Sequence, residues 1–192
     1  MDPLNIIAGL NVLFTFALNL TGAKKGLRST FTQTREKPDS YLQKLPLAFA
    51  TLTLIGLVFG IFQIGTIEYK KEYQTIRTVG LLIYLVFSWF QIWSYKSLGD
   101  FYSQEVLLFK DHKLIDKGPF RLIRHPQYLS QVLLDLGGGL ATLSCIVLPL
   151  AIIQIPFIIM RAQLEEKLLG KYFKDEFQAY KKRTGFMIPF IG

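Results

Sequence analysis

The sequence has little of the chemistry on which metalloproteins and many hydrolases rely. It contains one cysteine, Cys145, and two histidines, His112 and His125, among 192 residues. A single cysteine cannot form an internal disulfide. The two histidines are 13 residues apart with no cysteine near them, which matches no metal-ligand spacing, so no metal site is expected. A serine triad would also need a base and an orienting acid, and with only two histidines these are hard to place.

The chain also lacks internal repeats, low-complexity tracts and long linkers, so we predict a single domain over residues 1–192. What it has instead is long uncharged stretches, and 51% of its residues are hydrophobic. A helix crosses a bilayer with about 20 apolar residues. The stretch 132–160, with Asp135 as its one charge, is too long for one crossing, so we interpret it as part of a hairpin turning near Ser144 and Cys145. The prediction is an all-α integral membrane protein whose five transmembrane helices lie at about residues 3–23, 45–67, 78–95, 126–144 and 146–160.

Lysine and arginine indicate how these helices are oriented. Of the 22 basic residues, six lie in 24–44, six in 96–131 and seven in 161–192. Cytoplasmic segments retain positive charge, and five spans with an outside N-terminus place all three segments in the cytoplasm. The net charge of +8 therefore reflects topology and attraction to a lipid bilayer, and no nucleic-acid partner is expected. A cleaved signal peptide is the alternative for the first run, but the basic start of such signals is missing.

Two polar pieces flank the predicted hairpin, a loop at 96–125 and a C-terminal segment at 161–192. The loop ends in GPFRLIRHPQY, where Pro126 suits the first turn of a helix because its missing N–H is not needed there. The helix should therefore begin at His125 and Pro126 and turn its unpaired N–H groups toward the loop, an arrangement that favours an anion. In the C-terminal segment, apolar residues at helical spacing predict an amphipathic helix lying on the bilayer surface.

Several polar residues in these regions allow more than one interpretation. Arg161 and Glu165 are four residues apart and share a helix face, so they are either an ordinary ion pair or a functional pair. Asp135 lies within a predicted span, where a carboxylate is either functional or a neutral packing residue. The glycines at 137–139 follow no strand, so close helix packing or a bend explains them better than phosphate binding.

Taken together, HKLIDKGPFRLIRHPQY, RAQLEE and DEFQAYKKRTGFMIPFI resemble the integral membrane isoprenylcysteine carboxyl methyltransferase family and its prokaryotic relatives, within a wider superfamily that includes phospholipid methyltransferases. The resemblance covers roughly residues 96–192. It implies an enzyme that uses S-adenosylmethionine, releases S-adenosylhomocysteine, and methylates the carboxylate of a lipophilic acceptor such as a prenylcysteine. One position departs from the family pattern, because Phe120 stands where a tyrosine is usual and one hydroxyl contact is lost.

The resemblance also implies roles for individual residues. Arg161 would face the carboxylate of the acceptor and, with Glu165, form the catalytic pair. The implied cofactor contacts are Glu105 (with Gln104 as the alternative), His112, Lys113, Leu114, Ile115, Gly118, Phe120, His125, Pro126, Gln127, Tyr128 and Glu165.

Other functions remain as alternatives. Methylation of a phospholipid or other amine would need a base such as Glu166 or His112 to remove a proton. A membrane reductase using NADPH would need a further basic cluster, and a non-enzymatic scaffold would use the same polar residues only to anchor helices. The active site is expected on the cytoplasmic face, and the short stretch before the first span resembles prokaryotic members, which suggests a prokaryotic cytoplasmic membrane rather than the endoplasmic reticulum.

Overall fold

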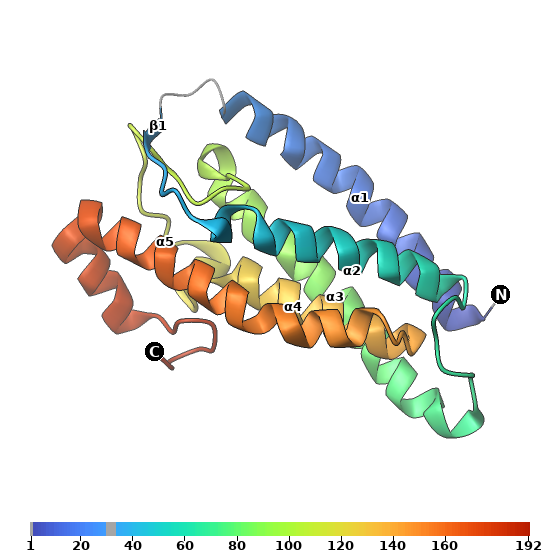
Figure 1. The fold of residues 1–192 in the computed structure, drawn as a ribbon. Helices are drawn as coiled ribbons and strands as arrows, with labels where there is room; N and C mark the ends of the chain where they lie inside the picture. The colour runs from blue at the N-terminus through green and yellow to red at the C-terminus, as the bar shows by residue number, and fades with distance from the viewer. Residues whose placement is uncertain (1, 30–33) are drawn as a thin grey trace.

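The computed structural model describes residues 2–29 and 34–192, with side chains described for 2–18 and 34–192. Within these residues the chain is almost entirely helical, as predicted (Figure 1). The α-helices are α1 (Pro3–Ser29), α2 (Leu45–Ile61), α3 (Gln74–Leu98), α4 (Pro126–Thr142) and α5 (Val147–Arg183). Two short strands, β1 (Thr34–Glu36) and β2 (Leu108–Phe109), pair antiparallel at one end of the bundle. This small sheet was not predicted from the sequence.

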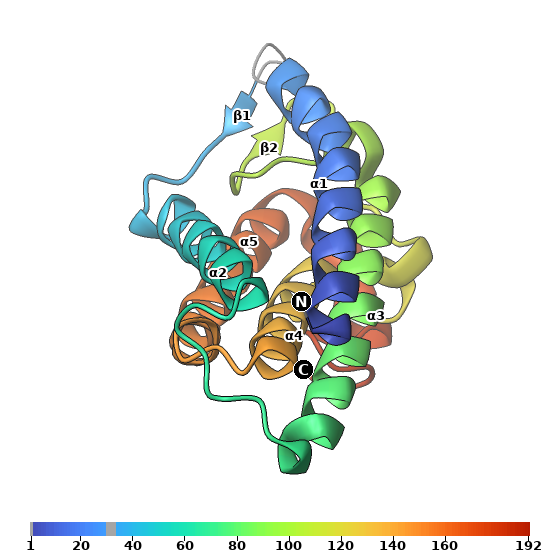
Figure 2. The same cartoon turned by 90° about the vertical axis from the view of Figure 1, so that its right-hand side faces the viewer.

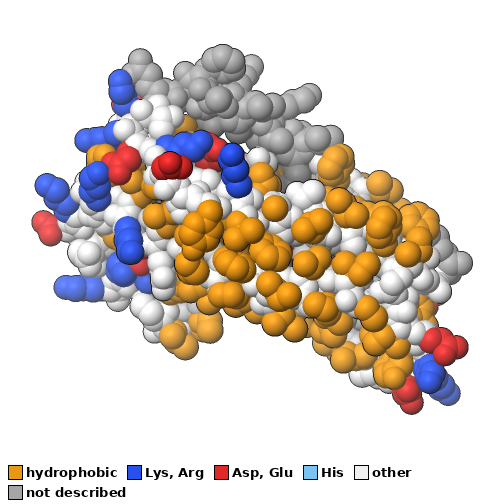
Figure 3. Space-filling view, viewed as in Figure 1, with side chains coloured by type: hydrophobic (Ala, Val, Ile, Leu, Met, Phe, Trp, Pro, Cys, Tyr) orange, Lys and Arg blue, Asp and Glu red, His pale blue; other side chains and the backbone are white. Residues whose placement is uncertain are grey.

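The helices run side by side as one bundle. Figure 2 shows α4 in the middle, with α1 and α3 on one side and α2 and α5 on the other. Hydrophobic side chains cover the flank of the bundle, whereas charged side chains gather toward its two ends (Figure 3). Within the described residues, three helical stretches are long and apolar enough to cross a membrane. These are Tyr41–Ile61, Lys71–Phe101 and Val147–Arg183.

Glycines allow α4 to sit in the middle of the bundle. A Cβ atom on Gly137 would lie 2.6 Å from the backbone nitrogen of Tyr84 in α3. A Cβ on Gly138 would lie 3.1 Å from Leu57 in α2, and one on Gly139 would lie 2.8 Å from Leu148 in α5. Three consecutive glycines therefore face three different helices, and the packing role predicted for them is confirmed.

The ends of α4 also follow from its sequence. The helix begins at Pro126, as expected from the missing N–H of proline. It stops at Thr142 because Leu143 adopts a left-handed conformation, with φ of 49°. The Ser144 hydroxyl then accepts hydrogen bonds from the backbone nitrogens of Ile146 and Val147, at 3.3 and 3.1 Å, and caps the start of α5. The hairpin turn thus lies where the sequence placed it.

The C-terminal helix differs from the expectation. The first part of the amphipathic segment continues α5 without a break from the apolar part, 147–160, as far as residue 173. At Lys174 the backbone is not helical (φ 41°, ψ −113°), and the residues after this kink form a second helical piece. The apolar face of the segment is buried inside the protein, where Leu168 packs with Val106 and Leu108. The prediction that this face lies on a bilayer surface was therefore wrong, since the loop between α3 and α4 covers it.

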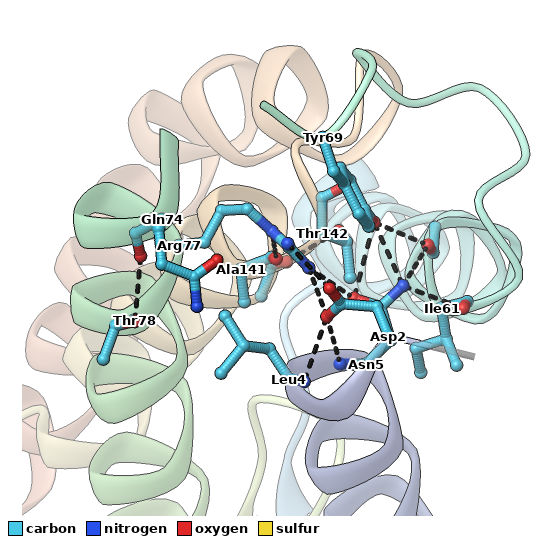
Figure 4. Close-up of polar contacts among 12 residues, drawn as sticks. Asp2, Leu4, Asn5, Ile61, Tyr69, Gln74, Arg77, Thr78, Ala141 and Thr142 are labelled. Carbon is cyan, nitrogen blue, oxygen red and sulfur yellow. Dashed lines mark hydrogen bonds and ion pairs between the residues drawn. The ribbon is translucent and has the colours of Figure 1, made fainter. Parts of the chain in front are cut away.

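At the opposite end of the bundle, Arg77 ties three helices together (Figure 4). Its side chain is 1% exposed and makes a two-pronged ion pair with Asp2, at 3.0 and 2.7 Å. It also donates to Asn5 Oδ1 and to the carbonyl of Ala141, both at 3.0 Å, and lies 3.5 Å from the centre of the Tyr69 ring. These contacts satisfy the buried guanidinium and join the start of α1 to α3 and to the end of α4.

Candidate functional site

The segment 118–128 and the C-terminal residues bind each other through the backbone. Leu122 O accepts from Gly185 N at 3.1 Å, Arg124 N donates to Gly185 O at 2.8 Å, and His125 N donates to Phe186 O at 3.1 Å. The Arg124 side chain adds hydrogen bonds to the carbonyl oxygens of Thr184 and of residues 181 and 192. Arg124, which lies in the stretch GPFRLIRHPQY, thus has a structural role and holds the C-terminal residues in place.

Glu166 is the acidic residue that binds the Arg124 side chain, and it lies in α5 beyond the apolar part. Its carboxylate accepts from Arg124 Nε at 2.5 Å and from Lys181 Nζ at 2.8 Å, and lies 3.3 Å from His125 Nε2. Burial alone would raise the pKa of Glu166, but its hydrogen bonds with these three partners outweigh burial and lower the pKa to about 2. A carboxylate this acidic and fully engaged is a poor proton acceptor at neutral pH.

A small cavity of about 80 Å³ lies between the loop, the start of α4 and the charged part of α5. It brings together most of the residues predicted to contact a cofactor, which come from residues 105–128 and from Glu165 in α5. Those that line it are Glu105, His112, Leu114, Ile115, Phe120, His125, Gln127, Tyr128 and Glu165. Lys113 and Gly118 do not line it because both face solvent, and Pro126 is buried in the first turn of α4.

His112 lies among aromatic rings at one side of this cavity. Its ring centre is 5.0 Å from that of Phe101, 6.0 Å from that of Phe109 and 6.1 Å from that of Phe173. Burial lowers the pKa of His112, and the charge of Glu165 opposes this shift without cancelling it. Its Nδ1 atom is buried and has no hydrogen-bond partner in the described part of the chain. A buried nitrogen without a hydrogen bond destabilises the folded state unless a ligand or a water molecule supplies the missing partner.

A second, larger cavity of about 410 Å³ lies among the five helices. Its wall is largely apolar and includes Val12 of α1, Leu54 and Leu57 of α2, Leu134 of α4 and Ile158 of α5. The volume falls within the range of about 300–1,000 Å³ that is usual for ligand sites. These residues could not be picked out from the sequence, because each belongs to a hydrophobic run in which any position might face the interior.

The two cavities meet at Tyr128, which lines both together with Ser103 and Gln127. The Tyr128 hydroxyl donates to Glu165 Oε2 at 2.9 Å and accepts from Arg161 Nε at 3.2 Å. Its ring stacks on His125, with ring centres 5.5 Å apart. The predicted pair Arg161 and Glu165 is therefore joined through a tyrosine rather than directly, with Glu165 on the small cavity and Arg161 on the large one.

Arg161 is held more tightly than expected for a free binding group. Its Nη1 donates to the carbonyls of Leu42 and Gln43, at 3.0 and 3.1 Å, and its Nη2 donates to the carbonyl of Gln104. With the bond to Tyr128, four of its five N–H groups have acceptors in the described structure. One N–H is left for a carboxylate, so Arg161 could donate only one hydrogen bond to an acceptor in this conformation. The structure also separates Gln104, which lines the larger cavity, from Glu105, which lines the smaller.

Some residues of the small cavity were missed in the sequence. Phe101, Leu168, Phe177 and Tyr180 all line it. The last three were recognised only as an apolar helix face, and that periodicity was the signal that could have placed them beside the loop. The Tyr180 hydroxyl donates to the carbonyl of Phe120 at 2.6 Å and fixes the one position that departs from the family pattern.

Residues 75–176, which hold α3, α4 and the part of α5 that lines both cavities, match the family model for phospholipid methyltransferases. The chain belongs to this family. Members it resembles include the protein-S-isoprenylcysteine O-methyltransferase of Saccharomyces cerevisiae, with 27% identity over 151 residues. This match covers 75% of the present chain and 62% of the yeast protein, so the chain spans less than two thirds of that relative.

A second relative is the protein-S-isoprenylcysteine O-methyltransferase of Schizosaccharomyces pombe, with 24% identity over 170 residues, 80% of this chain and 72% of that one. The fold is shared with the eukaryotic intramembrane Ras methyltransferase ICMT (isoprenylcysteine carboxyl methyltransferase). That structure superposes on the whole chain and on 69% of its own length, with a TM-score of 0.66 and 18% sequence identity. These matches confirm the family resemblance seen in the motifs. They also confirm the prediction of an integral membrane protein.

Proposed function

We propose that the protein is an S-adenosylmethionine-dependent methyltransferase that esterifies the carboxylate of a lipid-linked acceptor. The observation that carries this proposal is the pair of cavities that meet at Tyr128. One is small, aromatic and polar at the end of the bundle, and the other is larger and apolar between the helices. A reaction that joins a water-soluble donor to a lipid needs two such compartments with one shared boundary.

The small cavity suits the chemical groups of the cofactor. Its aromatic rings suit adenine and the sulfonium cation, the Glu165 carboxylate suits hydroxyl or ammonium donors, and His112 Nδ1 is a buried atom in need of a partner. Its volume of about 80 Å³ is too small for the whole molecule. Cofactor binding therefore requires a wider cavity than this conformation provides.

The bound cofactor supplies an electrophilic methyl group, and the chain orients the acceptor toward it. A carboxylate is already anionic at neutral pH, so no base is required. The remaining N–H of Arg161 holds the acceptor carboxylate, and Tyr128 keeps Arg161 in place at the boundary. Alignment of the reacting atoms then provides the main rate advantage.

Methylation of an amine lipid is the second candidate, and the description of the matching family model favours it. An amine must lose a proton before or during transfer, which needs a base. Glu166 is unsuited to this task because its pKa is about 2. His112 remains available for it, and its lowered pKa keeps it neutral at physiological pH.

We also propose that the chain crosses the membrane five times, with both cavities opening toward the cytoplasmic half. Besides the three long apolar stretches, α1 is apolar over Pro3–Leu18, and the 17 residues of α4 span about 26 Å, close to the thickness of a bilayer core. The orientation is the same for a prokaryotic cytoplasmic membrane and for the endoplasmic reticulum.

The topology can be tested with Cys145, the single cysteine, which is exposed at the turn between α4 and α5. A membrane-impermeant maleimide should label it from outside intact cells or from the lumenal side of sealed vesicles. A Cys145→Ser, Lys182→Cys variant should be labelled only after the membrane is opened. Labelling with the opposite sidedness would refute the proposed orientation.

The activity is tested by binding and by transfer. Glu165→Ala should abolish the calorimetric binding of S-adenosylmethionine, whereas Glu176→Ala, at an exposed position of the same helix, should not change it. Labelled methyl should appear as a base-labile ester on a prenylcysteine analogue. Label that appears only in the amine lipids of a membrane extract would replace the first proposal with the second, and unchanged cofactor affinity of Glu165→Ala would remove Glu165 from the site.

A further inference from the structure

The larger cavity contains a belt of polar side chains deep among the helices. Gln91 of α3 donates to Gln131 Oε1 at 2.8 Å, and Gln131 donates to Asp135 Oδ2 at 2.7 Å. Gln154 of α5 donates to the same Asp135 oxygen at 2.6 Å. Gln91, Gln131 and Asp135 all line the cavity, so a ligand inside it touches this belt.

The belt continues the polar boundary at Tyr128 into the apolar region. Gln127, Gln131 and Asp135 are spaced four residues apart, which places them on one face of α4. Asp135 is seven residues beyond Tyr128, or about 10 Å along the helix axis. Along the cavity wall, the first polar groups lie at Tyr128, where the two cavities meet. A second group of hydrogen-bonding atoms follows around Asp135, before the wall becomes apolar.

Polar side chains between membrane helices can serve only to hold the helices together. Two observations indicate more than that here. First, the belt is open to a cavity of about 410 Å³ rather than sealed between helices. Second, the Asp135 carboxylate lies on the cavity wall and has about four acceptor sites. It receives side-chain hydrogen bonds from Gln131, Gln154 and Thr53, so one acceptor site remains for a ligand.

A purely hydrocarbon chain lying against these groups would leave their remaining acceptor site without a hydrogen bond, at a cost in affinity. A chain that carries a hydroxyl group at this depth would donate to the Asp135 carboxylate or to Gln91 Oε1. We propose that the preferred acceptor is a hydroxylated lipid carboxylate, and that Asp135, Gln131 and Gln91 recognise its hydroxyl. This inference rests on the proposed function for the position of the carboxylate, but the polar belt itself can be tested by binding alone.

The test uses two synthetic S-alkylcysteine carboxylates of equal length, one with a hydroxyl about 10 Å from the carboxylate and one without. Their dissociation constants are measured on the full-length protein in lipid nanodiscs. The hydroxylated lipid should bind about 10- to 100-fold more tightly, as expected for a hydrogen bond to a charged group. A third lipid with its hydroxyl at the far end of the chain should show no such gain.

Variants then assign the preference to the belt. Gln91→Leu removes one member at the cavity wall, and Asp135→Asn keeps the shape of the side chain while removing its charge. Both should bring the affinities of the two lipids close together. Thr51→Val removes a hydroxyl elsewhere on the same wall, where it bonds only to Leu47 O of its own helix, and should keep the wild-type ratio.

Equal affinities of the two lipids for the wild-type protein, or a preference that survives both belt variants, would overturn the inference. Methyl transfer is measured separately on the same pair. Selective binding without transfer to either lipid would refute the proposed function and leave the hydroxyl site standing. Transfer to both lipids with equal efficiency and equal affinity would support the proposed function and refute the hydroxyl site.

Discussion

Replacing Tyr128 with phenylalanine removes one oxygen atom from the boundary between the two cavities. The ring and its stacking on His125 are kept, because that contact involves the ring alone. What is lost is the hydroxyl that donates to Glu165 at 2.9 Å and accepts from Arg161 Nε at 3.2 Å.

The size of the effect follows from the exposure of the two partners. The Glu165 side chain is 38% exposed and can exchange the lost bond for one to water. Arg161 is 6% exposed, so its Nε–H is left without a partner in a buried place, which costs about 1–3 kcal/mol. If Tyr128 holds Arg161 in the reactive geometry, kcat/KM for methyl transfer should fall by about 5- to 150-fold.

The assay measures labelled methyl transfer to a prenylcysteine analogue by the variant in nanodiscs, together with its melting temperature. Tyr69→Phe is the matched control, since it loses a hydroxyl that bonds to Thr142 O at 3.0 Å at the other end of the bundle. The control should lose some stability and retain its kcat/KM. A Tyr128→Phe protein with wild-type kcat/KM would refute the role given to this hydroxyl.

Three further predictions concern stability. Asp2→Asn should lower the free energy of unfolding by about 3 kcal/mol, because it leaves the buried Arg77 charge without its carboxylate, whereas Asp39→Asn, at an exposed position, should change little in the same melting experiment. Gly137→Ala should lower the free energy of unfolding by about 1–3 kcal/mol, because the added Cβ would clash with the backbone of α3. Gly170→Ala should be neutral or stabilising, because the atom nearest to its Cβ would lie 3.5 Å away, at an ordinary contact distance. The pKa of Glu166 is depressed from 4.5 to about 2, so its stabilising effect is complete above pH 4.5 and is lost as the pH falls toward 2. The stability difference between wild type and Glu166→Gln should therefore shrink over that range, and a difference independent of pH would contradict the assignment.

The features that sequence predicted well are those set by local chemistry. The start of α4 at Pro126 follows from one missing N–H, and the hairpin turn at Ser144 follows from the length of the apolar stretch and the polar residues within it. The grouping of loop and C-terminal residues in one site followed from motifs that resemble a family. Local sequence was sufficient for the start of α4 and for the hairpin turn because the deciding groups lie within a few residues of each other.

The features that sequence could not predict depend on partners that are distant along the chain. Nothing near Asp2 indicates that it pairs with Arg77, 75 positions away. Periodicity showed that one face of the C-terminal helix is apolar, but could not show that Val106 and Leu108 cover it in place of lipid. Arg161 was expected to be free for a substrate, and only the structure reveals that the backbone carbonyls of residues 42, 43 and 104 accept hydrogen bonds from three of its five N–H groups.

The contacts of Arg77 also bear on the order in which the chain is assembled. Asn5 can donate to the carbonyls of Gly60 and Ile61 as soon as α2 has been synthesised. The bonds of Asp2 and Asn5 to Arg77 must wait for residue 77, and the bond from Arg77 to Ala141 O must wait for a further 64 residues. The Arg77 cluster therefore completes the docking of α1 late in biogenesis, only when the end of α4 has emerged.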